Sequence, residues 1–253
     1  GETWATKAQW TVVADPTAPS LNVATPASGT TVCAGATVSA TFNAGSGGTG
    51  CGDEYQYSTN GGGTWAAYTP GNNITASTTG ANAIQIQTRR PCSGNGCDGA
   101  GETWATKAQW TVVADPTAPS LNVATPASGT TVCVGGTVSA TFNAGSGGTG
   151  CGDEYQYSTN GGGTWAAYTP GNNITASTTG ANAIQIQTRR PCSGNGCDGA
   201  GETWATKAQW TVVADPTWAT NSVSPTTVCE GGQVTFSAST SGGSGGSVSW
   251  IRS

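Results

Sequence analysis

The sequence contains no histidine and no methionine, and only 8% of its 253 residues are charged. Histidine is the side chain that most often moves protons near neutral pH, so its absence leaves carboxylates as the main groups for acid–base chemistry. Lysine and arginine total 8, against 13 acidic residues. Nucleic-acid binding needs clustered positive charge to neutralise phosphates, so this balance argues against a nucleic-acid partner.

Long apolar runs are also missing. No stretch approaches the roughly 18 consecutive apolar residues of a membrane-spanning helix, so we expect no membrane span in this segment. The first residues do not have the pattern of a signal peptide. Because the sequence begins in the middle of a repeat, we interpret it as a window of a longer protein.

Cysteine is plentiful and regularly placed, as four residues per repeat plus one more. An ordered set of cysteines without histidine predicts disulfides formed in an oxidising compartment. A zinc site at Cys92 and Cys97 is the disfavoured alternative, because the other two cysteines of a repeat are isolated and the loops are rich in glycine. The predicted disulfide cysteines are Cys33, Cys51, Cys92, Cys97, Cys133, Cys151, Cys192, Cys197 and Cys229.

The strongest feature is an internal repeat with a period of 100 residues. Residues 1–100 match residues 101–200 at every position but two, where Ala34 and Ala36 become Val134 and Gly136. Such a period is that of an independently folding domain, not of a solenoid repeat. We predict the last strand of a preceding domain at 1–16, complete domains at 17–116 and 117–216, and the start of a third, divergent domain at 217–253.

Alternation of apolar and polar residues dominates each repeat, and no segment has the 3.6-residue period of a helix. The alternation predicts strands around 21–23, 38–42, 55–58, 74, 84–89 and 104–112, separated by turns rich in glycine and proline. Six or seven short antiparallel strands in about 100 residues predict an all-β fold of tandem immunoglobulin-like sandwiches. Trp4 and Trp10, with their copies, share a face with Val12, so we expect them in the core.

The pairing of the cysteines is open from sequence. Cys51 and Cys92 are expected at the same end of the sandwich and form the simplest pair. Cys33 and Cys97 then lie about a strand length apart, roughly 30 Å, beyond the reach of a disulfide. Either the segment around Cys33 folds back to meet Cys97, or Cys33 pairs with a cysteine of the next domain, such as Cys197.

The segment that joins consecutive domains is short. Pro116 and Pro119 within it restrict the backbone to extended conformations. No flexible Gly/Ser run separates the domains, so we expect a semi-rigid array.

Few residues offer chemistry beyond disulfide formation. The adjacent Asp53 and Glu54 would face opposite sides of a strand, so we expect solvated acids and no enzyme. Asp98 and Glu102 flank a glycine-rich loop and are weak candidates for calcium ligands. No other cofactor is predicted.

Two further groups of side chains stand near strand ends. Trp65 and Trp165 follow glycine-rich turns and are the candidates for contact with a glycan or another surface. Arg89 and Arg90 end a strand and are expected as solvated charges that discourage pairing between sheet edges.

Two motifs resemble a known family. TVCEGGQVTF at 227–236 and the CSGNGCDGAGETWATKAQWTVVADP that closes each unit are similar to the immunoglobulin-like repeats of giant adhesins of gliding bacteria. The SprB-like gliding-motility adhesins, exported by the type IX secretion system, are the relatives that this resemblance suggests. It implies an extracellular filament on the cell surface that is moved by a motor and attaches to the substratum. Cys51 and Cys92 depart from the simplest two-cysteine form of these repeats.

These observations favour a structural role. The leading hypothesis is the stalk of an extracellular adhesin filament, with neighbouring repeats of the same chain and surface glycans or the substratum as partners. Near-identical copies support it, because reach and multivalency grow with copy number whereas an active site needs one copy. The alternative is an array of carbohydrate-binding modules in a secreted protein.

Overall fold

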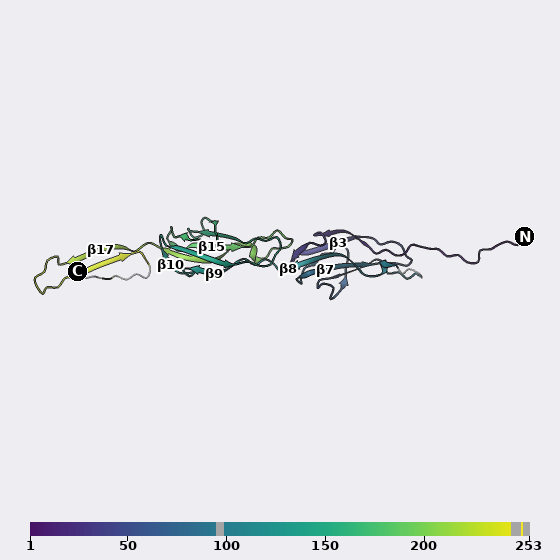
Figure 1. Cartoon of the computed structure of the whole chain (residues 1–253), viewed down its shortest axis with the longest axis horizontal. Helices are drawn as coiled ribbons and strands as arrows, with labels where there is room; N and C mark the ends of the chain where they lie inside the picture. The colour runs from purple at the N-terminus through teal and green to yellow at the C-terminus, as the bar shows by residue number, and fades with distance from the viewer. Residues whose placement is uncertain (95–98, 244–248, 250–253) are drawn as a thin grey trace. The chain divides into compact units, whose positions relative to one another are not determined.

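The computed structural model describes residues 1–94, 99–243 and 249, which form two units (Figure 1). Unit 1 consists of residues 1–116, 147–151 and 192–199, and unit 2 of residues 117–146, 152–191 and 200–253. Two loops of the second sequence repeat therefore belong to unit 1. The two units are defined by contacts within the structure, and their limits do not coincide with those of the sequence repeats. The domain boundaries predicted from the sequence therefore stay predictions. Cys97 and Asp98 lie outside the described residues.

Unit 1 is a sandwich of two sheets. One sheet has the order β1-β3-β6 and the other the order β2-β8-β7-β4-β5. A single 3-10 turn, η1 (Ala100–Glu102), precedes the last strand. The strands are β1 (Ser20–Thr25), β2 (Thr31–Cys33), β3 (Thr37–Asn43), β4 (Glu54–Ser58), β5 (Ala66–Ala67), β6 (Ile74–Thr75), β7 (Gly80–Arg89) and β8 (Ala105–Val113).

Unit 2 repeats this arrangement with sheets β14-β11-β9 and β10-β16-β15-β12-β13. It also contains the pair β17 (Thr217–Ser224) and β18 (Thr235–Ser241), which begins the divergent sequence. The remaining elements are β9 (Ser120–Thr125), β10 (Thr131–Cys133), β11 (Thr137–Asn143), β12 (Glu154–Ser158), β13 (Ala166–Ala167), β14 (Ile174–Thr175), β15 (Gly180–Arg189), η2 (Ala200–Glu202) and β16 (Ala205–Val213).

The core of each unit lies between its two sheets, because the alternating residues of both sheets point inward. In unit 1 the side chains of Ile84, Ile86 and Trp110 are fully buried and pack with Val38 of the opposite sheet. The indole N–H of Trp110 donates to the Pro26 carbonyl at 2.9 Å, so the large core side chain leaves no polar group unpaired. The fold is all-β and immunoglobulin-like, as the alternation predicts.

Some features differ from the sequence prediction. The three-residue strand β2 was not predicted, and it pairs parallel with β8, whereas only antiparallel pairs were expected. Trp4 and Trp10 are exposed, because residues 1–13 form no strand in this structure. Trp104 precedes β8 and is half-buried at the surface. No helix in the described residues is long and apolar enough to cross a membrane.

Candidate functional site

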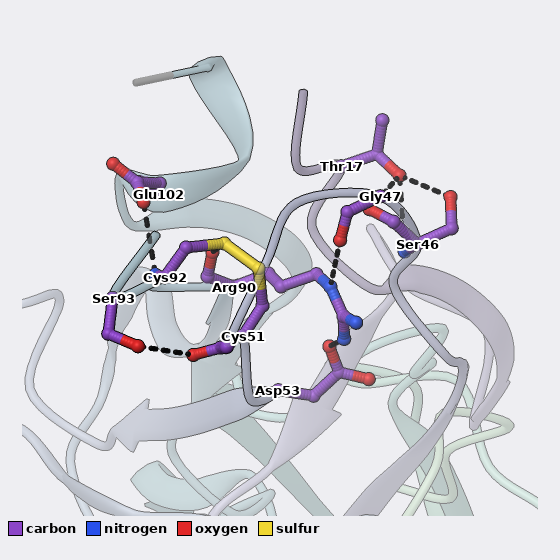
Figure 2. Close-up of a disulfide and its surroundings, with 10 residues drawn as sticks. Thr17, Ser46, Gly47, Cys51, Asp53, Arg90, Cys92, Ser93 and Glu102 are labelled. Carbon is purple, nitrogen blue, oxygen red and sulfur yellow. Dashed lines mark hydrogen bonds and ion pairs between the residues drawn. A yellow bond between two sulfur atoms is a disulfide. The ribbon is translucent and has the colours of Figure 1, made fainter. Parts of the chain in front are cut away.

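A disulfide ties together two loops at one end of unit 1. Cys51 precedes β4 and Cys92 follows β7, and their Cα atoms lie 4.0 Å apart (Figure 2). Backbone bonds flank the bridge, with the Gly52 N–H donating to the Pro91 carbonyl at 3.2 Å. The two cysteines are 41 residues apart, so this bond stabilises the fold by about 4 kcal/mol in the chain-entropy description.

An ion pair lies beside this disulfide. Nη1 of Arg90 contacts Oδ1 of Asp53 at 2.6 Å, and its Nε–H donates to the Gly47 carbonyl at 3.3 Å (Figure 2). The other carboxylate oxygen of Asp53 accepts the Gly45 N–H at 3.0 Å. The Arg90 and Asp53 side chains are only 20% and 18% exposed. The expectation of a solvated Arg90 is therefore wrong, because β7 delivers it under the loop that carries Asp53.

The neighbouring pair is closer to solvent. Arg89 pairs with Glu54 at 2.6 Å, with side chains 34% and 46% exposed, and its guanidinium lies 4.5 Å from the ring centre of Trp104. Burial raises the pKa of Tyr55, and the Asp53 carboxylate raises it further. Tyr55 thus stays neutral in the core layer beneath these charges.

Glu102 has a structural contact. Its Oε1 accepts the Cys92 N–H at 3.0 Å, which joins η1 to the disulfide (Figure 2). The other calcium candidate, Asp98, lies outside the described residues. Within the described ranges, three or more His, Cys, Asp or Glu side chains nowhere come together as a set of metal ligands.

The segment that leads into each repeat is enclosed by glycine turns. In unit 1 the Gly48 N–H donates to the Ala14 carbonyl at 2.7 Å, and Thr17 exchanges backbone hydrogen bonds with Ser46. On the other side Gly101 lies against Pro16 so closely that a Cβ would sit 2.7 Å from the Pro16 carbonyl carbon. The connecting backbone is therefore bonded to the loops and not left as a free linker.

The same contacts recur where the first repeat leads into the second. The Gly148 N–H donates to the Ala114 carbonyl at 2.7 Å. A Cβ at Gly199 would lie 2.9 Å from Cβ of Asp115 and 3.2 Å from Cδ of Pro116. All of these residues belong to unit 1. Pro116, one of the two prolines expected to stiffen this connector, thus lies beside Gly199, which has no side chain and lets its loop approach closely.

Replacing Gly101 with Ala tests this enclosure. The new methyl group would meet the Pro16 carbonyl and would lie 2.8 Å from the Ala18 backbone nitrogen, and neither atom belongs to a flexible side chain. We expect Gly101→Ala to lower the free energy of unfolding by about 1–3 kcal/mol in urea titrations. Gly52→Ala is the matched control, because a Cβ there meets no atom within 4 Å, and its effect should stay within about 0.5 kcal/mol. Equal effects of the two substitutions would contradict the enclosure.

A second kind of disulfide joins consecutive sequence repeats. Cys33, at the end of β2, is bonded to Cys197, 164 residues later, with Cα atoms 5.0 Å apart. The Cys33 N–H donates to the Asn195 carbonyl at 2.9 Å, and both cysteines are buried. Of the two pairings left open from sequence, the structure has the bond to the next repeat. Among the described disulfides, this bond closes the largest loop. It stabilises the folded state by about 5 kcal/mol in the chain-entropy description.

The other predicted site residues differ in whether they are paired and in how far they are buried. Cys151 and Cys192 are paired like Cys51 and Cys92, with a Cα separation of 3.9 Å. Cys133 and Cys229 are free thiols, contrary to their prediction as disulfide cysteines, because the described residues bring no cysteine to either. Trp65 and its copy Trp165 are half-buried beside the turns at Gly62 and Gly162.

Two features of these sites were not predicted from the sequence. The Arg90–Asp53 pair joins residues 37 positions apart, and one side chain of the pair stands in a loop without periodicity. The role of Gly196 was also missed, although its φ of +70° and its position one residue before Cys197 are typical of a glycine that shapes a turn.

No protein-family description matches the chain, and no curated protein matches it. Among solved structures, the chain is similar to the N-terminal four Ig domains of Dscam1 isoform 8.4, with 11% identity over 94% of this chain and a TM-score of 0.23. The match spans 60% of that protein's chain. Disulfides and an immunoglobulin-like fold are typical of extracellular domains.

Proposed function

We propose that this chain is a non-catalytic, load-bearing segment of an extracellular adhesin filament on a cell surface. The observation that carries the proposal is the Cys33–Cys197 disulfide, which joins one repeat covalently to the next. A stack of sandwiches held only by hydrogen bonds and apolar contacts lengthens whenever one of them unfolds. A covalent bond between repeats removes that weakness, because tension passes through the sulfur atoms.

The contacts of the acidic residues support the absence of catalysis in this proposal. Asp53 and Glu54 are each engaged by an arginine, and Glu102 accepts a backbone N–H. A general acid or base needs a proton-transfer group that is open to a substrate. In the described residues these carboxylates instead hold loops together.

The more specific assignment draws on the sequence resemblance. Near-identical repeats with a VCxGxxV motif and a late glycine-cysteine loop support a gliding-motility adhesin exported by the type IX system. The carbohydrate-binding alternative has less support, because Trp65 is half-buried and the ring of Trp104 carries the Arg89 guanidinium at 4.5 Å. Trp65 is thus partly covered, and the ring of Trp104 already contacts a cation.

The proposal is tested in cells that carry the full-length protein. Replacing Cys33 and Cys197 with Ser removes the bond between repeats but leaves the Cys51–Cys92 and Cys151–Cys192 bonds. We expect unchanged attachment in still medium and a clear loss of attached cells under flow. Cys229→Ser is the control, because this thiol is unpaired and exposed. Unchanged attachment of the double variant under flow would mean that the bond carries no load.

A further inference from the structure

The β2 and β10 strands have nearly the same sequence but different surroundings. In β2, Val32 and Cys33 are fully buried, and Ala36 is 8% exposed. The corresponding Val132 and Cys133 of β10 are only partly buried. Both strands pair parallel with the last strand of their sandwich in the same register, so the difference comes from what covers the other edge.

The cover of β2 is the loop that ends at Cys197. Val32 pairs parallel with Asn195, the Cys33 N–H donates to the Asn195 carbonyl at 2.9 Å, and Cys197 completes the disulfide. Gly196 lies against Ala36 so closely that a Cβ would sit 2.8 Å from Cα of Ala36. The loop thus forms a single parallel bridge with an open sheet edge, where the backbone hydrogen bond holds it and the lack of space at Gly196 selects its sequence.

The edge of β10 has the same pattern of backbone donors. The Val134 N–H donates to the Val213 carbonyl at 2.9 Å, as the N–H of Ala34 does to Val113. Because N–H groups alternate in direction along a strand, the Cys133 N–H points to the opposite, open edge. Cys133 carries a free thiol there.

The two sequence differences between the repeats fall within this segment. Ala34 and Ala36 of the first repeat are Val134 and Gly136 in the second. A Cβ at Gly196 would meet the Ala36 methyl group first, so the absence of this methyl group at Gly136 leaves the open edge with more room for the same loop.

We propose that the edge of β10, formed by Val132, Cys133 and Gly136, is a docking site for the Ser-Gly-Asn-Gly-Cys loop of another copy of this repeat, with a disulfide to Cys133 closing the contact. The occupant is identified by the same five residues, Ser193–Cys197, which end on β2 in unit 1. The proposal rests on the proposed function and deepens it, since the covalent bond between repeats would then recur from each repeat to the next. Failure of docking at Cys133 would leave the Cys33–Cys197 tether, and its role under load, untouched.

The test uses the whole oxidised chain and a synthetic peptide, SSGNGCDGAGE, which has the sequence of residues 192–202 with serine in place of Cys192. The cysteine of the peptide is supplied as a mixed disulfide with glutathione. The Cys133 thiolate attacks the peptide sulfur, a new disulfide forms, and glutathione leaves as a thiolate that takes up a proton, so no other oxidant is needed. Peptide mapping by mass spectrometry measures the adducts at Cys133 and Cys229. We expect about tenfold faster labelling of Cys133, although Cys229 is the more exposed thiol.

A matched peptide separates docking from simple thiol reactivity. In SSGNACDGAGE, alanine replaces the glycine that corresponds to Gly196, whose φ is +70° and which has no space for a Cβ. This peptide should lose the preference for Cys133. Docking should also slow hydrogen exchange at the Cys133 amide. We expect this slowing with SSGNGCDGAGE and not with SSGNACDGAGE. Equal labelling of Cys133 and Cys229, or equal behaviour of the two peptides, would overturn the proposal.

Discussion

Stretching the oxidised chain by its two ends will release no length from the residues between Cys33 and Cys197. The disulfide holds their Cα atoms 5.0 Å apart, and the 164 residue steps between them lie outside the path of the force. Strands β3 to β15 are therefore shielded even when their hydrogen bonds break. Full reduction opens this loop and should add about 57 nm of contour length, at about 3.5 Å per residue. Single-molecule force spectroscopy with and without a reductant measures the difference.

The remaining disulfides provide an internal control for this experiment. Both Cys51–Cys92 and Cys151–Cys192 lie inside the large loop, and each spans 41 residues. In the oxidised Cys33→Ser, Cys197→Ser variant they should still conceal their own loops, so the gain should be about 29 nm, half of the fully reduced value. If the wild-type chain already releases the full length before reduction, the bond between repeats does not form.

The strands were predictable because their alternation records which side chains are buried. The core positions Ile84, Ile86 and Trp110 stand at even spacing in the sequence and lie on one face in the structure. The strand β2 was missed because three residues are too few to establish a period, and its parallel partner follows 80 positions later. Short strands of this kind depend on the sheet that they join and not on their own propensity.

The site was predictable in composition but not in connectivity. The number and spacing of the cysteines predicted disulfides. Whether Cys33 pairs with Cys97 or with Cys197 depends on which loop reaches β2, and the two repeats have identical loops. The half-buried state of Arg90 was also missed, because its neighbour Arg89 has the same local sequence context but points to the other face of β7. Side chains one residue apart on a strand enter different environments.

This contrast between adjacent arginines gives the second large expected effect. Arg90→Met keeps roughly the aliphatic part of the side chain but removes the cation that pairs with Asp53 and the hydrogen bond to the Gly47 carbonyl. The Asp53 carboxylate is then left only 18% exposed without its cation, which should cost about 2–4 kcal/mol of unfolding free energy. Scanning calorimetry should show one lowered transition, because Arg190 and Asp153 of unit 2 keep their own 2.6 Å pair as an internal reference.

Arg89→Met, at the adjacent position where β7 ends, is the matched control. Its ion pair with Glu54 is more exposed, and such pairs contribute about 0.5 kcal/mol, to which the contact with Trp104 adds a similar amount. We therefore expect a loss of about 1 kcal/mol, clearly smaller than that of Arg90→Met. Since Arg90 also connects the loop before β4 to the end of β7, its loss should expose the Cys51–Cys92 bond to faster reduction, which Arg89→Met should not do. Equal melting curves for the two variants would show that the half-buried pair contributes no more than a surface pair.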